Sequence, residues 1–133
     1  MSTTPFQLGC IAEPLQVKWG VSHYDEGQKA RAIQVNIDYA DQKTDIDAID
    51  DSLVKFDSGG RAVARLKIWQ NAKVTEHGSD KKFKVDDLQR GDQIVVIAKP
   101  YYWVFEGREG VSLNVSDILI VKRVALNQPP KWT

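Results

Sequence analysis

The chain has 133 residues, of which 42% are hydrophobic and 27% charged, the composition of one globular domain with a core of its own. Eighteen lysines and arginines balance eighteen aspartates and glutamates, so the net charge favours neither a nucleic acid nor a membrane as partner. The single cysteine, Cys10, excludes an internal disulfide bond and fits a reducing compartment.

No stretch of the chain has the pattern of a targeting or anchoring signal. The first ten residues lack the basic start and apolar run of a signal peptide, and no apolar run approaches the ~20 residues that span a bilayer. We therefore expect a soluble, cytoplasmic protein without a membrane partner. Residues 1–126 are interpreted as one domain and residues 127–133, NQPPKWT, as a flexible C-terminal tail.

Runs in which apolar and polar residues alternate predict β-strands along most of the chain. The five predicted strands are residues 15–23, 31–40, 61–71, 92–105 and 110–124, and EGREG at 106–110 indicates a tight connection. The apolar faces of the first three strands are formed by Leu15, Val17, Trp19 and Val21, by Ile33, Val35, Ile37 and Tyr39, and by Leu66 and Ile68.

Two segments between the strands have helical features. In residues 44–56, Ile46, Ile49, Leu53 and Phe56 are spaced by three or four, which predicts an amphipathic helix with Thr44 as a cap. An irregular acidic loop is the alternative for this segment. Residues 84–92 favour a short turn of helix that ends at Gly91. The fold class is therefore all-β with one or two short helices.

Charge is segregated along the chain although it sums to zero. Residues 38–57 contain seven aspartates and two lysines, whereas residues 61–90 contain eight basic and four acidic residues. A basic patch can bind an anion even at zero net charge. The acidic segment either covers that patch as a weak competitor of nucleic acid or points into solvent.

The strand at 61–71 predicts the most informative surface. With Leu66 and Ile68 in the core, Arg65, Lys67 and Trp69 face outwards together. Single-stranded nucleic acid requires cations for its phosphates and flat rings for its bases, so this row fits it. The alternative is a solvated face with one exposed tryptophan. In the following loop, DKKFKV at 80–85, a phenylalanine among lysines fits a clamp on the strand or, equally, an anchor to the core.

The stretch AKPYYWVFEGREGVSLNV at 98–115 has four aromatic residues within five positions. Alternation sets Tyr101, Trp103 and Phe105 on one face of a strand and Tyr102 on the other, so some of these rings point away from the core. Pro100 predicts a bend or bulge that shifts the phase. The exposed rings would extend a stacking platform.

Nothing in the chain predicts catalysis, a cofactor or a metal. His23 and His77 lie outside any metal-ligand spacing, and neither a glycine-rich phosphate loop nor a recognisable nucleophile is present. The acidic run at 45–51 lacks the glycine and closing glutamate of a calcium loop. An enzyme is therefore the weakest functional class.

Residues 88–122, LQRGDQIVVIAKPYYWVFEGREGVSLNVSDILIVK, resemble the last two strands of the OB-fold single-stranded DNA-binding proteins of bacteria and phages. The resemblance is carried by Leu88, Arg90, Gly91, Ile94, Val96, Trp103, Gly107, Gly110 and the strand from Val111. ARLKIWQN at 64–71 is similar to that family's central strand, where basic and aromatic residues meet DNA. PPKWT stands where the family has an acidic tail, and residues 41–51 form an unusual acidic insert, which favours a phage, plasmid or mobile-element version.

The resemblance implies a five-stranded Greek-key OB barrel that binds single-stranded DNA with little sequence preference, in replication or recombination. RNA as the ligand and assembly into a homo-oligomer are left open. The alternative is an OB-fold protein-interaction module or structural subunit whose aromatic residues form an interface core. The predicted nucleic-acid-binding residues are Arg65, Lys67, Trp69, Lys73, Lys81, Lys82, Phe83, Lys84, Lys99, Tyr101, Tyr102, Trp103, Phe105 and Arg108.

Overall fold

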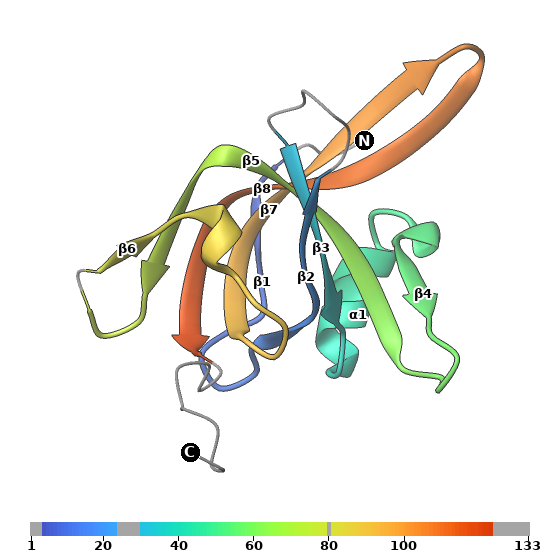
Figure 1. Cartoon of the computed structure of the whole chain (residues 1–133). Helices are drawn as coiled ribbons and strands as arrows, with labels where there is room; N and C mark the ends of the chain where they lie inside the picture. The colour runs from blue at the N-terminus through green and yellow to red at the C-terminus, as the bar shows by residue number, and fades with distance from the viewer. Residues whose placement is uncertain (1–3, 24–29, 80, 124–133) are drawn as a thin grey trace.

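Five long strands close into a barrel in the computed structural model, which describes residues 4–23, 30–79 and 81–123. Around the ring these are β2 (Leu15–His23), β3 (Ala30–Asn36), β5 (Ala62–Glu76), β8 (Arg108–Lys122) and β7 (Gln93–Phe105) (Figure 1). Neighbours pair antiparallel, except that β5 and β8 pair in parallel and so close the ring. The five predicted strands and the all-β OB barrel are confirmed.

Short strands and short helical segments pack around this barrel. β1 (Phe6–Leu8) pairs with β7, whereas β4 (Val54–Phe56) and β6 (Lys82–Phe83) each pair with β5. One α-helix, α1 (Ala40–Asp47), and two 3-10 turns, η1 (Asp51–Leu53) and η2 (Val85–Asp87), complete the described part. The short helical turn predicted within residues 84–92 is present as η2, but it ends at Asp87 and not at Gly91. No helix in the described ranges is both long and apolar enough to cross a membrane.

Isoleucine, valine and leucine from the inward faces of the strands fill the barrel. Leu66 and Ile68 of β5 are fully buried, which confirms the predicted phase of that strand. Most other predicted core positions are buried too, namely Leu15, Val17, Ile33, Val35 and Ile37. Tyr39 is instead 37% exposed, because it stands at the N-cap of α1 where the chain leaves the sheet. The side chains of Trp19 and Val21 lie outside the described part.

The helix predicted at 44–56 is only partly right. The observed helix begins four residues earlier, and after Asp47 the chain passes through η1 into β4. Thr44 is not a cap, since its Oγ1 donates to Ala40 O within the helix at 2.9 Å. Asp50 interrupts the helical pattern by accepting from Ser52 N, and Val54–Phe56 gains ladder hydrogen bonds to β5. Phe56 is therefore an exposed strand residue.

Pro100 does not distort the strand as predicted. It is buried and stays in register with Leu113, whereas the register shift lies earlier, between Ile97 and Ala98. Strand β1 ends opposite Ala98, so beyond that point one edge of β7 is open within the described residues. An open edge is the setting in which strands tolerate a residue without an N–H group.

Beyond Pro100, β7 and β8 continue as a two-stranded arm that projects from the barrel (Figure 1). We call residues 101–112 the arm. Its tip is a two-residue turn in which Glu106 and Gly107 both have positive φ, 51° and 77°. This is the turn that matches the twist of a hairpin and favours glycine in the second position. The tight connection predicted at 106–110 is confirmed.

Candidate nucleic-acid interface

The outward face of β5 carries the predicted basic and aromatic row. Arg65 and Trp69 are exposed and Lys67 is half-buried, while the residues between them face the core. The Lys67 ammonium lies 5.1 Å from the centre of the Trp69 ring, close enough for a cation–π contact. This contact holds a cation beside a ring that remains 43% exposed, so a ligand can reach the ring.

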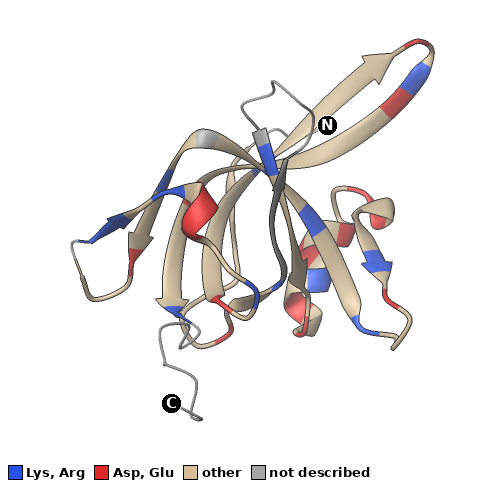
Figure 2. Ribbon diagram, in the orientation of Figure 1, with Lys and Arg blue, Asp and Glu red and all other residues tan. Residues whose placement is uncertain are grey.

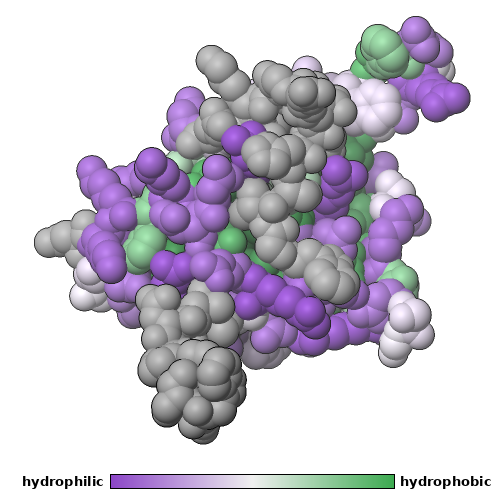
Figure 3. Space-filling view, viewed as in Figure 1, coloured by the Kyte–Doolittle hydropathy of each residue, from purple (hydrophilic) through white to green (hydrophobic). Residues whose placement is uncertain are grey.

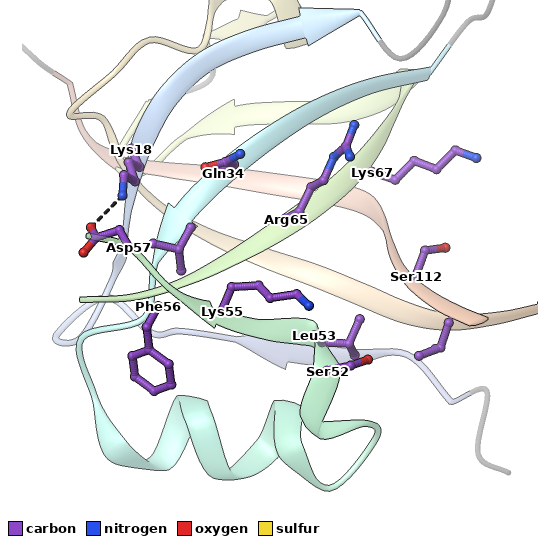
Figure 4. Close-up of a pocket in the computed structure, with 12 residues that line it drawn as sticks. Lys18, Gln34, Ser52, Leu53, Lys55, Phe56, Asp57, Arg65, Lys67 and Ser112 are labelled. Carbon is purple, nitrogen blue, oxygen red and sulfur yellow. Dashed lines mark hydrogen bonds and ion pairs between the residues drawn. The ribbon is translucent and has the colours of Figure 1, made fainter. Parts of the chain in front are cut away.

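A groove of about 360 Å³ runs along this row, between β4, β5 and the start of the arm. Four cationic side chains line it, and Figure 4 shows Lys55 reaching from β4 towards the side of β5 that carries Arg65. Gln34 and Ser112 add hydrogen-bonding groups. The lining cations are Lys18, Lys55, Arg65 and Lys67. The groove can therefore attract a polyanion although the whole chain is neutral.

Asp57 is the carboxylate at the end of the groove. Its Oδ2 lies 2.6 Å from Lys18 Nζ, and its Oδ1 accepts from the backbone N–H groups of Gly59 and Arg61, both at 2.9 Å. The hydrogen bond from Lys18 is the main cause that holds the pKa of Asp57 below its usual value, and the bond from Arg61 N adds to it. Asp57 thus stays ionised and occupies one donor of Lys18.

A second hollow, of about 410 Å³, joins the row on β5 to the base of the arm. Trp69 lines it together with Lys99 and Asn114, and Asn114 also pairs with Lys67 across the β5–β8 ladder. The Ser112 hydroxyl donates to Asn114 Oδ1 at 3.1 Å, so the polar side chains of β8 link the two hollows. The candidate surface is therefore continuous from β4 to the arm.

The two faces of the arm differ in kind. Cross-strand pairing places Tyr101, Trp103 and Phe105 on the face of Ser112, whereas Tyr102 and Val104 point to the opposite face. Trp103 lies over Gly110, where an added Cβ would come within 2.1 Å of the ring. Phe105 and Val104 are 67% and 74% exposed, and Figure 3 shows apolar surface near the tip of the arm. The rings at the odd positions continue the surface that begins at Trp69.

No protein-family model and no curated protein matches the chain by sequence. Solved structures of two phage proteins do match. A C-terminally truncated single-stranded DNA-binding protein from bacteriophage Enc34 gives a TM-score of 0.65 at 10% identity, over 90% of this chain and 86% of that one. That phage's protein in complex with ssDNA gives 0.63 at 10% identity, over 87% and 85%. Gp2.5, a single-stranded DNA-binding protein encoded by bacteriophage T7, gives 0.59 at 13% identity, over 96% and 91%. The chain has the fold of these phage proteins.

On this OB fold, the predicted loop residues lie away from the groove. Lys81, Lys82 and Lys84 surround β6, near the end of β5 opposite to β4 (Figures 1 and 2). Phe83 is partly buried against the core, and its ring lies 4.9 Å from the Arg123 guanidinium. This placement favours the anchor over the clamp. Lys73 likewise lines a hollow of β1, β7 and β8 rather than the groove.

The acidic segment does not cover the basic row. Figure 2 shows its acidic residues over α1 and the turns beside it, and Asp38 accepts from Arg61 at 2.7 and 2.8 Å. Of the seven aspartates in residues 38–57, Asp57 alone is placed in the groove by the described residues. No cluster of three or more metal-ligating side chains occurs in the described ranges.

Two groove cations were missed by the sequence interpretation. Lys18 lies between Val17 and Trp19 on β2, and alternation alone would have placed it on the outer face. Lys55 was assigned to a helix, which concealed its strand position opposite Val63. Neither residue could be placed near Arg65 without knowing that β4 pairs with β5 and that β2 pairs with β3.

Proposed function

We propose that this chain binds single-stranded DNA without strong sequence preference, as a replication or recombination protein of a phage or related mobile element. One observation carries the proposal: a cation-lined groove and a set of exposed rings lie on one continuous surface from Lys55 through Trp69 to the arm. The fold likeness supports it, because the matching phage proteins are named as single-stranded DNA-binding proteins and one was solved with ssDNA. The site of action would be the cytoplasm of the bacterial host.

Backbone phosphates would lie in the groove and bases on the rings beside it. Lys55, Arg65 and Lys67 supply charge along the groove. Trp69 supplies the first ring, and Tyr101 and Trp103 continue the platform. Each stacked base contributes ~1–3 kcal/mol. Stacking on a ring face requires unpaired bases, so the same surface disfavours a duplex.

Little sequence preference follows from the chemistry of this surface. Every base has a π-face, and a ring that stacks on it reads no base edge. Two of the uncharged polar side chains along the groove and the hollow beside it are already engaged, since Ser112 donates to Asn114 and Ser116 donates to Asp117. The lining uncharged polar residues are Gln34, Ser52, Asn71, Ser112, Asn114 and Ser116. The proposed activity is binding, with no chemical step.

A fluorescence titration with oligo-dT, duplex DNA and oligo-U at two salt concentrations tests the proposal. We expect oligo-dT to quench tryptophan emission because Trp69 and Trp103 stack on bases, with affinity falling steeply as salt rises. Duplex DNA should bind more weakly, and oligo-U reports whether RNA is also accepted. A chain that leaves every oligonucleotide unbound would support the protein-interaction alternative, whose apolar interface should respond little to salt.

A further inference from the structure

A third hollow, of about 310 Å³, adjoins the groove on the far side of Asp57. It shares Lys18 and Asp57 with the groove, so the ion pair between these residues forms the boundary of the two compartments. Arg61 and Arg90 also line it. The hollow lies where the turn after β4 faces β2 and the turn before β7.

Arg90 is held beside Lys18 by the backbone. Gly91 N donates to Val17 O at 2.8 Å, and Val17 N donates to Asp92 O at 2.9 Å. The turn is fixed from within as well, since Gln89 N donates to Asp92 Oδ2 at 2.9 Å. These bonds fix the turn at 89–92 against β2, immediately before Lys18. The backbone that carries the exposed Arg90 side chain is therefore held next to Lys18.

Three cations, Lys18, Arg61 and Arg90, line this compartment together with one carboxylate, Asp57. Arg61 already gives two donors to Asp38, and Lys18 gives one of its three donors to Asp57. Arg90 adds a further positive charge next to Lys18. Asn36 lines the same hollow, and its Nδ2 donates to Gln16 Oε1 at 3.3 Å. The compartment is therefore polar and positively charged, which suits a phosphate group.

We propose that this compartment is a second subsite for single-stranded DNA, in which Lys18 and Arg90 bind a backbone phosphate beyond the Lys18–Asp57 ion pair. The inference rests on the proposed function and extends it. The nucleic-acid path would run from the arm through the groove, pass Asp57, and end at the turn 89–92.

Oligonucleotide length separates the two subsites. OB folds engage ~4–16 nucleotides, so an oligo-dT near the lower limit fits the groove alone and one near the upper limit reaches both compartments. Arg90→Ala should flatten the slope of log affinity against log salt by ~0.7 for the long oligonucleotide only. If the wild type and Arg90→Ala bind equally at ~1 M salt, this change in slope makes the variant bind about fivefold more weakly at ~0.1 M.

Two variants control the measurement. Arg90→Lys keeps the charge and should restore the wild-type slope. Lys43→Ala removes one positive charge from α1, outside the compartment, and should leave the slope at both lengths unchanged. An Arg90→Ala effect that is equal at both lengths, or absent with the long oligonucleotide, would overturn the second subsite while leaving the groove intact. Failure of the wild-type chain to bind either length would instead overturn the proposed function.

Discussion

Trp69 is the residue whose role is most sharply defined by its surroundings. Its neighbour Ile68 is fully buried, Lys67 lies over its ring, and its own side chain faces the hollow that leads to the arm. A tryptophan in the core would contribute to folding, whereas one on this face contributes contact area to a ligand. Truncation of the side chain should lower the stability of the fold in the first case and the affinity for the ligand in the second.

Trp69→Ala should therefore weaken oligo-dT binding by ~1–3 kcal/mol and leave the thermal midpoint nearly unchanged. Titration and thermal unfolding of the same samples measure both quantities. Trp69→Phe is the matched control, since a smaller ring should keep part of the affinity. A large drop in thermal midpoint with unchanged affinity would place Trp69 in the structure rather than in the interface.

Asp57 opposes the cations around it, and its removal should tighten binding. Asp57→Asn removes a negative charge from the groove and frees the Lys18 ammonium, while the asparagine Oδ1 can still accept from Gly59 N and Arg61 N. Asp45→Asn and Asp51→Asn change the net charge equally but lie on α1 and η1. The titration should show a gain for Asp57→Asn that exceeds both controls at physiological salt, where long-range charge effects are screened. Equal gains from all three variants would argue against a local competitor.

At the scale of elements, the proposed stacking platform is the arm, which projects from the barrel. Trp103 is held by its contact with Gly110 on the partner strand, a position that only a residue without Cβ can fill. The contact fixes the ring on the face shared with Ser112. The orientation of the platform thus depends on one glycine.

Gly110→Ala should displace the Trp103 ring, because the new Cβ would lie 2.1 Å from its nearest ring atom. We expect a shift in tryptophan emission and severalfold weaker binding of oligo-dT, with the thermal midpoint little changed since the arm projects from the barrel. Ser112→Ala, on the same strand and face, is a control for a small change without ring displacement. Wild-type affinity in Gly110→Ala would show that the Trp103 position is irrelevant to binding.

The β6 loop should behave as part of the scaffold. Phe83 packs against the core and beneath Arg123, which also donates to Asp87 O at 2.7 Å. Phe83→Ala should thus destabilise the fold by about 1–3 kcal/mol in denaturant unfolding. Replacing the three lysines at 81, 82 and 84 with alanine should leave the salt slope of oligo-dT binding unchanged. A flattening of that slope by up to ~2 would restore the clamp interpretation.

The alternation of apolar and polar residues correctly predicted features that depend on a single strand. It failed for features that depend on which strands pair with one another. The phase of Arg65, Lys67 and Trp69 was predictable because Leu66 and Ile68 are in the same run. The helix boundary was not, since the spacing of Ile46, Ile49 and Leu53 fits a helix while pairing with β5 draws the following residues into β4. Lys18 and Lys55 became groove residues only through that pairing.

At the scale of the whole molecule, segregated charge reconciles a neutral chain with a polyanionic ligand. Acidic residues gather over α1 and its flanking turns, while the groove is lined by four cations and one carboxylate (Figure 2). Of the aspartates in residues 38–57, Asp57 alone lines the groove in the described part of the chain. Lys99 adds a cation at the base of the arm, whereas Arg108 near the tip lies between Glu106 and Glu109.

The salt dependence of binding should therefore reflect the groove and not the net charge. Each phosphate neutralised on a single strand contributes ~0.7 to the slope of log affinity against log salt. The four groove cations predict a slope near −3. Lys99, Arg108 and Arg90 of the proposed second subsite would bring it to about −5 with an oligo-dT long enough to reach them. Titrations of oligo-dT from low to physiological salt measure it. Lys55→Ala should reduce the magnitude by ~0.7, whereas Lys43→Ala, on α1, should not. A slope near zero with binding intact would mean that stacking alone holds the ligand and that the cations along β4 and β5 have another role.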